Sequence, residues 1–151
     1  MTETTQGSTK TLYDADFYAW TQEQAKLLRD RQWDQVDLEN IIEEIESLGR
    51  QERSELRNRL TVLLGHLLKW QFQPNMRSRS WRMTIREQRR QIREHIEENP
   101  SLQPYIPEAM NKAYEGGKML AASETSLETE AFPEGCPYSF EEAIDDSFFP
   151  D

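Results

Sequence analysis

Hydrophobic side chains recur along most of this chain at the three- and four-residue spacing of α-helices. The longest series predicts one continuous helix over residues 38–70. Its buried stripe is expected to contain Leu38, Ile41, Ile45, Leu56, Leu60, Leu63 and Leu67. Gly49 lies inside the series and costs about 1 kcal/mol relative to alanine, but the hydrophobic phase continues across it. We therefore expect one long helix that ends at Gln73, because the residue before a proline is pushed out of helical geometry.

Shorter series predict further helices on both sides of the long one. Asp14 or Asp16 can cap a helix that carries Phe17 and Trp20 and ends near Arg31, with Trp33 in a short connection. A second helix follows Arg77-Ser-Arg-Ser80 and ends at Asn99-Pro100, and its inward stripe is Trp81, Ile85, Gln88, Ile92 and Ile96. A third runs from Ser101 to about Ser123, and the capping box Ser139-x-x-Glu142 opens a short fourth one.

These elements predict an all-α fold, an up-down helical bundle of about four helices with a short C-terminal helical appendage. Residues 1–11 are rich in Thr, Gln and Ser without periodicity, so we expect a disordered N-terminal tail. Residues 12–151 are expected to form a single helical domain, long enough to bury roughly 70% of its unfolded surface.

The sequence lacks the residues that disulfide bonds, membrane spans and common metal sites require. The lone Cys136 has no intrachain partner, and no apolar run approaches the roughly 20 residues that span a bilayer, which favours a cytoplasmic protein without membrane contact. The Glu-x-x-His pairs of carboxylate-bridged metal sites are absent, because Leu63 and Ile92 stand three residues before His66 and His95. We therefore expect no metal site and no cofactor.

The formal charge of −10 is distributed in three blocks. Residues 1–48 carry a net charge of −7, residues 49–93 carry +9 and residues 94–151 carry −12. Within the basic block, Arg82, Arg86, Arg89 and Arg93 follow helical spacing and form one stripe. This stripe either pairs with acidic side chains such as Glu108, Glu115 and Glu124 inside the fold or across a dimer, or it binds an anionic partner.

Positive charge should concentrate at the turn after the long helix. No acidic residue occurs between Glu55 and Glu87 to neutralise it locally, and a helix N-terminus favours anions. The tryptophans that flank the turn can stack on a base or a guanidinium, although on apolar stripes they are more often core residues. The candidate anion-binding or partner-binding residues are Lys69, Trp70, Arg77, Arg79, Trp81, Arg82 and Arg86.

A weaker pattern concerns catalysis. Small helical bacterial ribonucleases carry an arginine followed by four to six residues and a histidine, which stabilise phosphate charge and move a proton. Arg59 and His66 have this spacing and share a helix face. The pattern is short in a chain with many arginines, so a hydrogen-bonded structural His66 is favoured over a catalytic one.

Four strings together resemble one family. They run from Leu12 to Trp20, from Asp37 to Gly49, from His66 to Gln71 and from Arg77 to Arg89. The chain from about Leu12 to Asp151 resembles the bacterial, largely cyanobacterial, family called domain of unknown function 29. The resemblance implies a compact helical fold in a bacterial cytoplasm and implies no activity.

The sequence thus favours a non-enzymatic interaction module that binds a protein partner or itself. The alternative is a nucleic-acid or nucleotide-handling protein, with a small helical RNase as its enzymatic form, that uses the Arg-rich segment 77–93.

Overall fold

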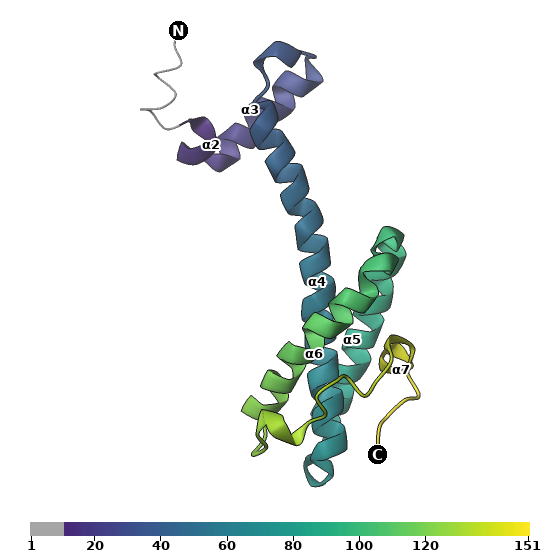
Figure 1. The fold of residues 1–151 in the computed structure, drawn as a ribbon. Helices are drawn as coiled ribbons and strands as arrows, with labels where there is room; N and C mark the ends of the chain where they lie inside the picture. The colour runs from purple at the N-terminus through teal and green to yellow at the C-terminus, as the bar shows by residue number, and fades with distance from the viewer. Residues whose placement is uncertain (1–10) are drawn as a thin grey trace. The chain divides into compact units, whose positions relative to one another are not determined.

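Every regular element of residues 11–151, the part of the chain that the computed structural model describes, is a helix (Figure 1). The all-α prediction is therefore confirmed. The tail predicted for residues 1–11 lies outside the described residues except for Thr11, whose hydroxyl caps the first helix. No helix of the described part is both long enough and apolar enough to cross a membrane.

The long helix α4 runs without a break from Leu38 to Phe72, as the hydrophobic phase predicted. Gly49 does not interrupt it, and its φ angle is not positive. The contacts of the chain group into an N-terminal unit, of which residues 11–50 are described, and a C-terminal unit of residues 51–151.

The N-terminal unit consists of short helices followed by the start of α4. Helix α2 (Leu12–Ala15) is capped by Thr11, and α3 (Phe17–Arg29) is capped by Asp16, one of the two predicted caps. A 3₁₀ turn, η1 (Trp33–Gln35), leads to Asp37, whose carboxylate accepts from the indole Nε1 of Trp20 at 3.0 Å. The side chain of Gln24 accepts from the backbone N–H of Asp37 at 2.7 Å, so polar contacts fix the entry into α4.

The C-terminal unit is built around the second half of α4. Helices α5 (Arg79–Glu98) and α6 (Ile106–Ser123) follow it, and successive long helices run in opposite directions (Figure 1). The turns between them are η2 (Pro74–Met76) and η3 (Pro100–Tyr105), and the chain ends with η4 (Thr129–Ala131) and α7 (Phe140–Ile144). Ser139 and Glu142 form the predicted capping box of α7.

Two sequence expectations about these helices were wrong. The helix expected from Ser101 begins as the 3₁₀ segment η3, and α-helical geometry starts only at Ile106. In a helix capped by Ser101, Pro107 would lie in the interior, where it has no N–H for the carbonyl oxygen of Gln103 and its ring clashes with that carbonyl. In α6 it falls in the first turn, where a proline is tolerated. The long stripe of α4 is buried from Leu56 onward, but Leu38 and Ile45 are about 60% exposed and Ile41 is only half-buried.

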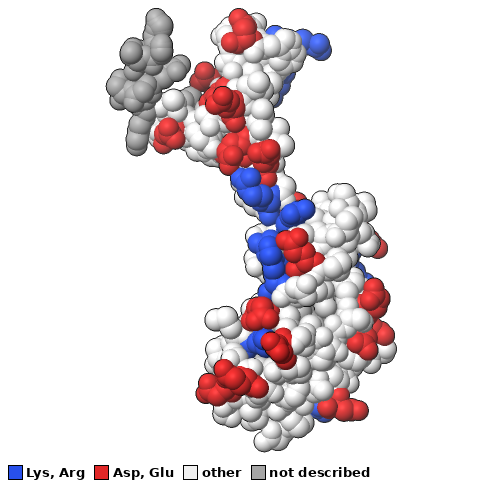
Figure 2. Space-filling view, viewed as in Figure 1, with Lys and Arg blue, Asp and Glu red and all other residues white. Residues whose placement is uncertain are grey.

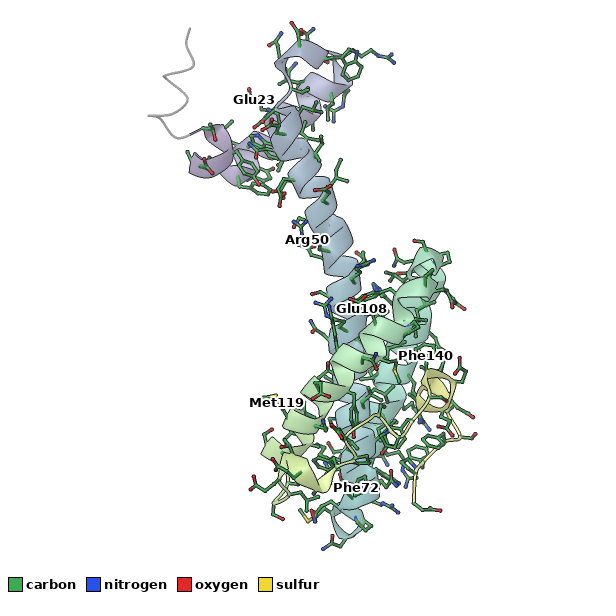
Figure 3. The ribbon with its side chains drawn as sticks, in the orientation of Figure 1. Glu23, Arg50, Phe72, Glu108, Met119 and Phe140 are labelled. Atoms are coloured by element: carbon green, nitrogen blue, oxygen red, sulfur yellow. The ribbon has the colours of Figure 1, made fainter. Side chains whose placement is uncertain are left out.

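The core of the C-terminal unit contains side chains from α4, α5, α6 and the segment after α6 (Figure 3). The stripe Leu56, Leu60, Leu63 and Leu67 is fully buried there, as predicted. Ile85 and Ile92 of α5 are fully buried as well. The sequence therefore located the core correctly in this unit.

Helices α4 and α6 approach each other closely at two glycines. A Cβ built on Gly117 would lie 3.1 Å from the backbone nitrogen of Gly65 and 3.3 Å from the carbonyl oxygen of Thr61. These neighbours are backbone atoms of α4, which cannot rotate away. The Gly116-Gly117 pair, which weakens a helix by propensity, permits this contact.

We expect Gly117→Val to lower the free energy of unfolding by about 2 kcal/mol or more, because its side chain would overpack the α4–α6 contact. Gly49→Ala is the matched control on α4. A Cβ there meets nothing within 4 Å, so we expect stability to rise by about 0.5–1 kcal/mol. Urea denaturation followed by circular dichroism measures both changes. Equal effects of the two substitutions would contradict the close contact.

Candidate functional site

Three arginines of the segment 77–93 hold the C-terminal segment in place. Arg89 is 1% exposed, and its guanidinium donates to the carbonyl oxygens of Ala143 at 2.7 Å and Phe148 at 2.6 Å. Arg93 donates to the carbonyl oxygen of Ile144 at 2.8 Å. Arg77 reaches further along the same segment, to the carbonyl oxygen of Pro150 at 3.3 Å. These arginines therefore bind backbone oxygens of their own chain.

The three acidic side chains named for this role have other partners within the described chain, although Arg93 of the stripe does pair with Asp146 at 3.2 Å. Glu108 pairs with Lys112, Glu115 pairs with Lys118, and Glu124 pairs with Lys69. Part of the stripe is bound by backbone carbonyls instead, which no charge pattern could have indicated.

Next to the bound arginines lies a cleft of about 440 Å³ that we call the arginine cleft. Its lining residues are Trp70, Arg77, Ser78, Arg79, Arg82, Met83 and Arg86. Ser78 caps α5 by accepting from the N–H of Trp81 at 3.1 Å, so the cleft lies at the positive end of that helix. A second cleft of about 430 Å³ shares Arg82 and Arg86 and continues along α5.

The exposed arginines of the cleft have no acidic partner. Across residues 11–151, no carboxylate lies within 4.0 Å of the charged groups of Arg79, Arg82 or Arg86. The guanidinium of Arg82 lies 5.2 Å from the ring centroid of Trp70 and 5.8 Å from that of Phe149. Stacking on aromatic faces orients the group and leaves its N–H edges free to donate.

Five of the seven residues predicted for an anion or partner site meet in this cleft, namely Trp70, Arg77, Arg79, Arg82 and Arg86. Lys69 and Trp81 do not line it. Lys69 is buried, pairs with Glu124 at 2.5 Å and lies 4.8 Å from the ring centroid of Trp81. The hydrogen bond from Lys69 also keeps the pKa of Glu124 below its usual range. Sequence reasoning did not single out Ser78 or Met83 as cleft residues.

Trp70 offers no free face for a nucleic-acid base. Its side chain is 6% exposed, and the guanidinium groups of Arg77 and Arg82 and the ring of Phe149 lie against it. It contributes apolar support for the arginines, as expected for a tryptophan on an apolar stripe.

Arg59 and His66, the pair considered for catalysis, make separate contacts. His66 is buried, and its Nδ1 lies 2.8 Å from the carbonyl oxygen of Val62, one turn earlier in α4. Burial lowers the pKa of His66. Arg59 pairs with Glu55 at 3.0 Å and lines a different, shallow cleft that His66 does not enter.

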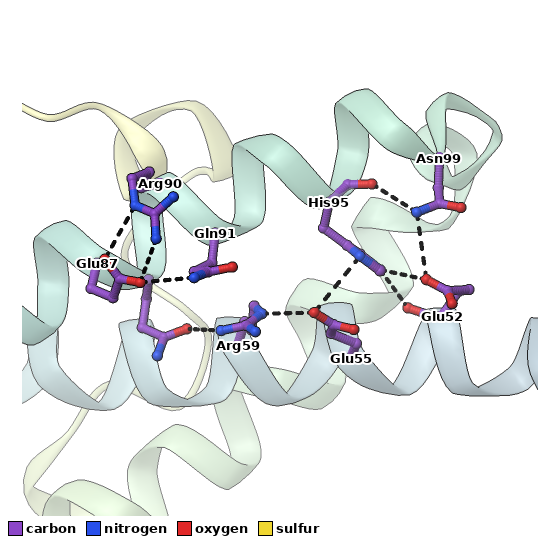
Figure 4. A network of polar contacts seen from close by, with 9 residues as sticks. Glu52, Glu55, Arg59, Glu87, Arg90, Gln91, His95 and Asn99 are labelled. Carbon is purple, nitrogen blue, oxygen red and sulfur yellow. Dashed lines mark hydrogen bonds and ion pairs between the residues drawn. The ribbon is translucent and has the colours of Figure 1, made fainter.

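One histidine lies beside two carboxylates in a polar network between α4 and α5 (Figure 4). Glu52, Glu55 and His95 each bring a possible metal-ligand atom within 4.8 Å of the others, which no sequence spacing indicated. The Nε2 of His95 lies 2.9 Å from the carbonyl oxygen of Glu52, and Glu55 already accepts from Arg59. A carboxylate oxygen of Glu52 lies 3.5 Å from the same Nε2, so the three side chains belong to one network of polar contacts.

The N-terminal unit exposes an unusual amount of apolar surface. Nine of the twelve large hydrophobic side chains that are exposed in residues 11–151 lie between Leu12 and Leu48. In contrast, Trp20 and Gln24 are the only buried residues among residues 11–50. Four exposed side chains, Leu38, Ile42, Ile45 and Leu48, follow helical spacing on α4. We call these four residues the apolar face.

Acidic side chains border the apolar face. Glu39 and Glu46 directly follow Leu38 and Ile45, which places each about 100° around the helix from its apolar neighbour. Residues 11–50 carry ten acidic and four basic side chains. Figure 2 shows several groups of acidic residues on the surface that this unit presents in that view. Helix α4 therefore exposes a hydrophobic strip that is bordered by negatively charged side chains.

Comparison with protein families gives a match over nearly the whole chain. The family described as "Domain of unknown function DUF29" matches residues 12–149. No curated protein and no solved structure matches the chain.

Proposed function

Because the chain belongs to the DUF29 family, whose description names no activity, we propose from its geometry that it is a non-enzymatic cytoplasmic interaction module. Its partner is a protein that presents a basic amphipathic helix, and the apolar face of α4 is the docking surface. The observation that carries this proposal is the exposed apolar face in a unit with only two buried residues among residues 11–50.

Burial supports the need for a partner. Small folded units become stable by burying apolar surface, and contiguous exposed apolar surface commonly marks an interaction site. From Leu38 to Leu48 the face extends about 15 Å along the helix, at 1.5 Å per residue. An apolar strip of this length on one helix fits the apolar stripe of a second helix.

Charge supports a basic partner rather than a second copy of the same unit. The described part of the unit has six more acidic than basic side chains, so two such units brought together would repel each other. Lysines or arginines beside the apolar stripe of a partner would meet Glu39 and Glu46 instead. Arg50 already pairs with Glu43 at 2.8 Å, so that carboxylate is partly neutralised.

The test measures binding of designed helical peptides to the protein. One peptide carries leucines at helical spacing with lysines beside them, and in two control peptides glutamates replace the lysines or serines replace the leucines. We expect the leucine–lysine peptide to bind, and Ile42→Ala, Ile45→Ala and Leu48→Ala combined to weaken binding by at least about tenfold, because less apolar area is buried. Fluorescence anisotropy of labelled peptides gives the dissociation constants.

Charge variants separate this site from non-specific attraction. Glu39→Gln with Glu46→Gln should weaken binding, whereas Glu23→Gln, an exposed carboxylate of α3, is the matched control. Equal binding by the alanine variant and the parent would contradict the proposal. A parent that sediments as a dimer, with the alanine variant sedimenting as a monomer, would instead make a second copy the occupant.

A further inference from the structure

The arginine cleft carries an inference that is independent of the apolar face. We propose that it binds the phosphate group of a small molecule through Arg79, Arg82 and Arg86. The site lies wholly in the C-terminal unit, between the end of α4 and the start of α5.

The number of donors in the cleft favours phosphate over a carboxylate. Besides Arg77, which is bound to carbonyl oxygens, three guanidinium groups line one cleft of about 440 Å³, and no acidic partner in the described chain neutralises these three. A carboxylate has two oxygens and one negative charge, so a single arginine fork satisfies it. A phosphate monoester carries close to two negative charges and three terminal oxygens, so it accepts from several arginines at once.

The surroundings of the three arginines add to this preference. Arg82 is stacked on Trp70 and Phe149, which reduces the rotamer freedom that it would lose when it binds a ligand. The N-terminus of α5, with Ser78 as its cap, adds partial positive charge at the same place. Met83, which is exposed at the cleft, offers apolar contact to the part of the ligand next to the phosphate.

The extent of the site favours a small molecule over a nucleic acid. Beyond Arg86, the next arginines of the stripe, Arg89 and Arg93, are bound to carbonyl oxygens of the C-terminal segment. A strand of phosphates would therefore find few further free cations. Single-stranded nucleic acids also use exposed aromatic rings for stacking, and Trp70 is covered. The cleft volume lies within the range of roughly 300–1,000 Å³ that is typical of small-molecule sites.

The experiment titrates the full chain with four probes at low salt, using isothermal titration calorimetry. The probes are inorganic phosphate, adenosine monophosphate, succinate and a short single-stranded RNA. The variants are Arg79→Gln, Arg82→Gln and Arg86→Gln, each alone, and Arg29→Gln is the control because it removes an exposed arginine of α3. Circular dichroism melting of each variant checks that it is folded. Arg82→Lys serves as a second variant that keeps the charge and loses the planar fork.

We expect Arg29→Gln to bind phosphate and adenosine monophosphate with the same affinity as the parent. Both proteins should bind these two ligands more tightly than they bind succinate. Each glutamine variant should weaken phosphate binding by about tenfold, the loss expected for a hydrogen bond to a charged group. Added salt should weaken binding further. The proposal is overturned if no phosphate compound binds, if succinate binds as tightly, if the glutamine variants bind like the parent, or if RNA alone binds. None of these outcomes bears on the apolar face, whose peptides are tested separately.

Discussion

Replacing Arg89 with methionine should lower the free energy of unfolding by about 3–5 kcal/mol and release the C-terminal segment from α5. Methionine nearly fills the same volume but donates no hydrogen bond. The carbonyl oxygens of Ala143 and Phe148, now 2.7 and 2.6 Å from the guanidinium, would lose their donor, in a buried contact at Ala143 and a partly buried one at Phe148. Each unsatisfied buried group costs about 1–3 kcal/mol, and breaking a buried charged network costs about 3–5 kcal/mol.

One effect opposes this loss. Burial lowers the pKa of Arg89, which shows that the guanidinium itself is held at a desolvation cost that methionine would remove. We expect the orphaned carbonyls to dominate, because the native contacts are several and short. Urea denaturation gives the stability change, and limited proteolysis after residue 143 reports release of the segment.

Arg90→Met is the matched control for this experiment. Arg90 is the next residue of α5, is exposed, and among residues 11–151 pairs only with Glu87 and Glu94 on its own helix. Exposed ion pairs of this kind contribute about 0–1 kcal/mol, so the control should change stability little. If Arg89→Met and Arg90→Met were equally stable, the carbonyl contacts of Arg89 would not hold the segment.

The second large effect is expected at Leu63. Leu63→Ala should cost about 2–5 kcal/mol, because Leu63 is fully buried and its truncation leaves a cavity. Leu48→Ala is the control, because it makes the same change on the same helix at a side chain that is 60% exposed. We expect that control to stay within about 0.5 kcal/mol of the parent. Chemical denaturation, followed by a signal from the core of the C-terminal unit, gives the free energy of unfolding of both variants. Similar losses of stability in the two variants would contradict the assigned core.

The candidate site was only partly readable from the sequence. The turn after α4 was predicted as the positively charged place, and five of its seven predicted residues line the arginine cleft. Lys69 does not line the cleft and pairs instead with Glu124, 55 positions later, which local sequence could not indicate. Nor did helical spacing distinguish buried Arg89 from exposed Arg86, since both lie on the same stripe.

The helices and most of their ends follow from local sequence. Hydrophobic phase, proline positions and the caps Asp16, Ser139 and Glu142 act within a few residues, so local chemistry suffices to predict them. Which parts of a hydrophobic stripe are covered, and which arginines are free, depends on contacts between distant segments. The hydrophobic spacing of α4 is the same at Ile45 and at Leu63, but only Leu63 is buried. Burial depends on whether a distant segment packs against the position. In the same way, Arg89 became structural because the carbonyl oxygens of residues 143–148 lie against it, whereas Arg79, Arg82 and Arg86 remain unpaired within the described chain.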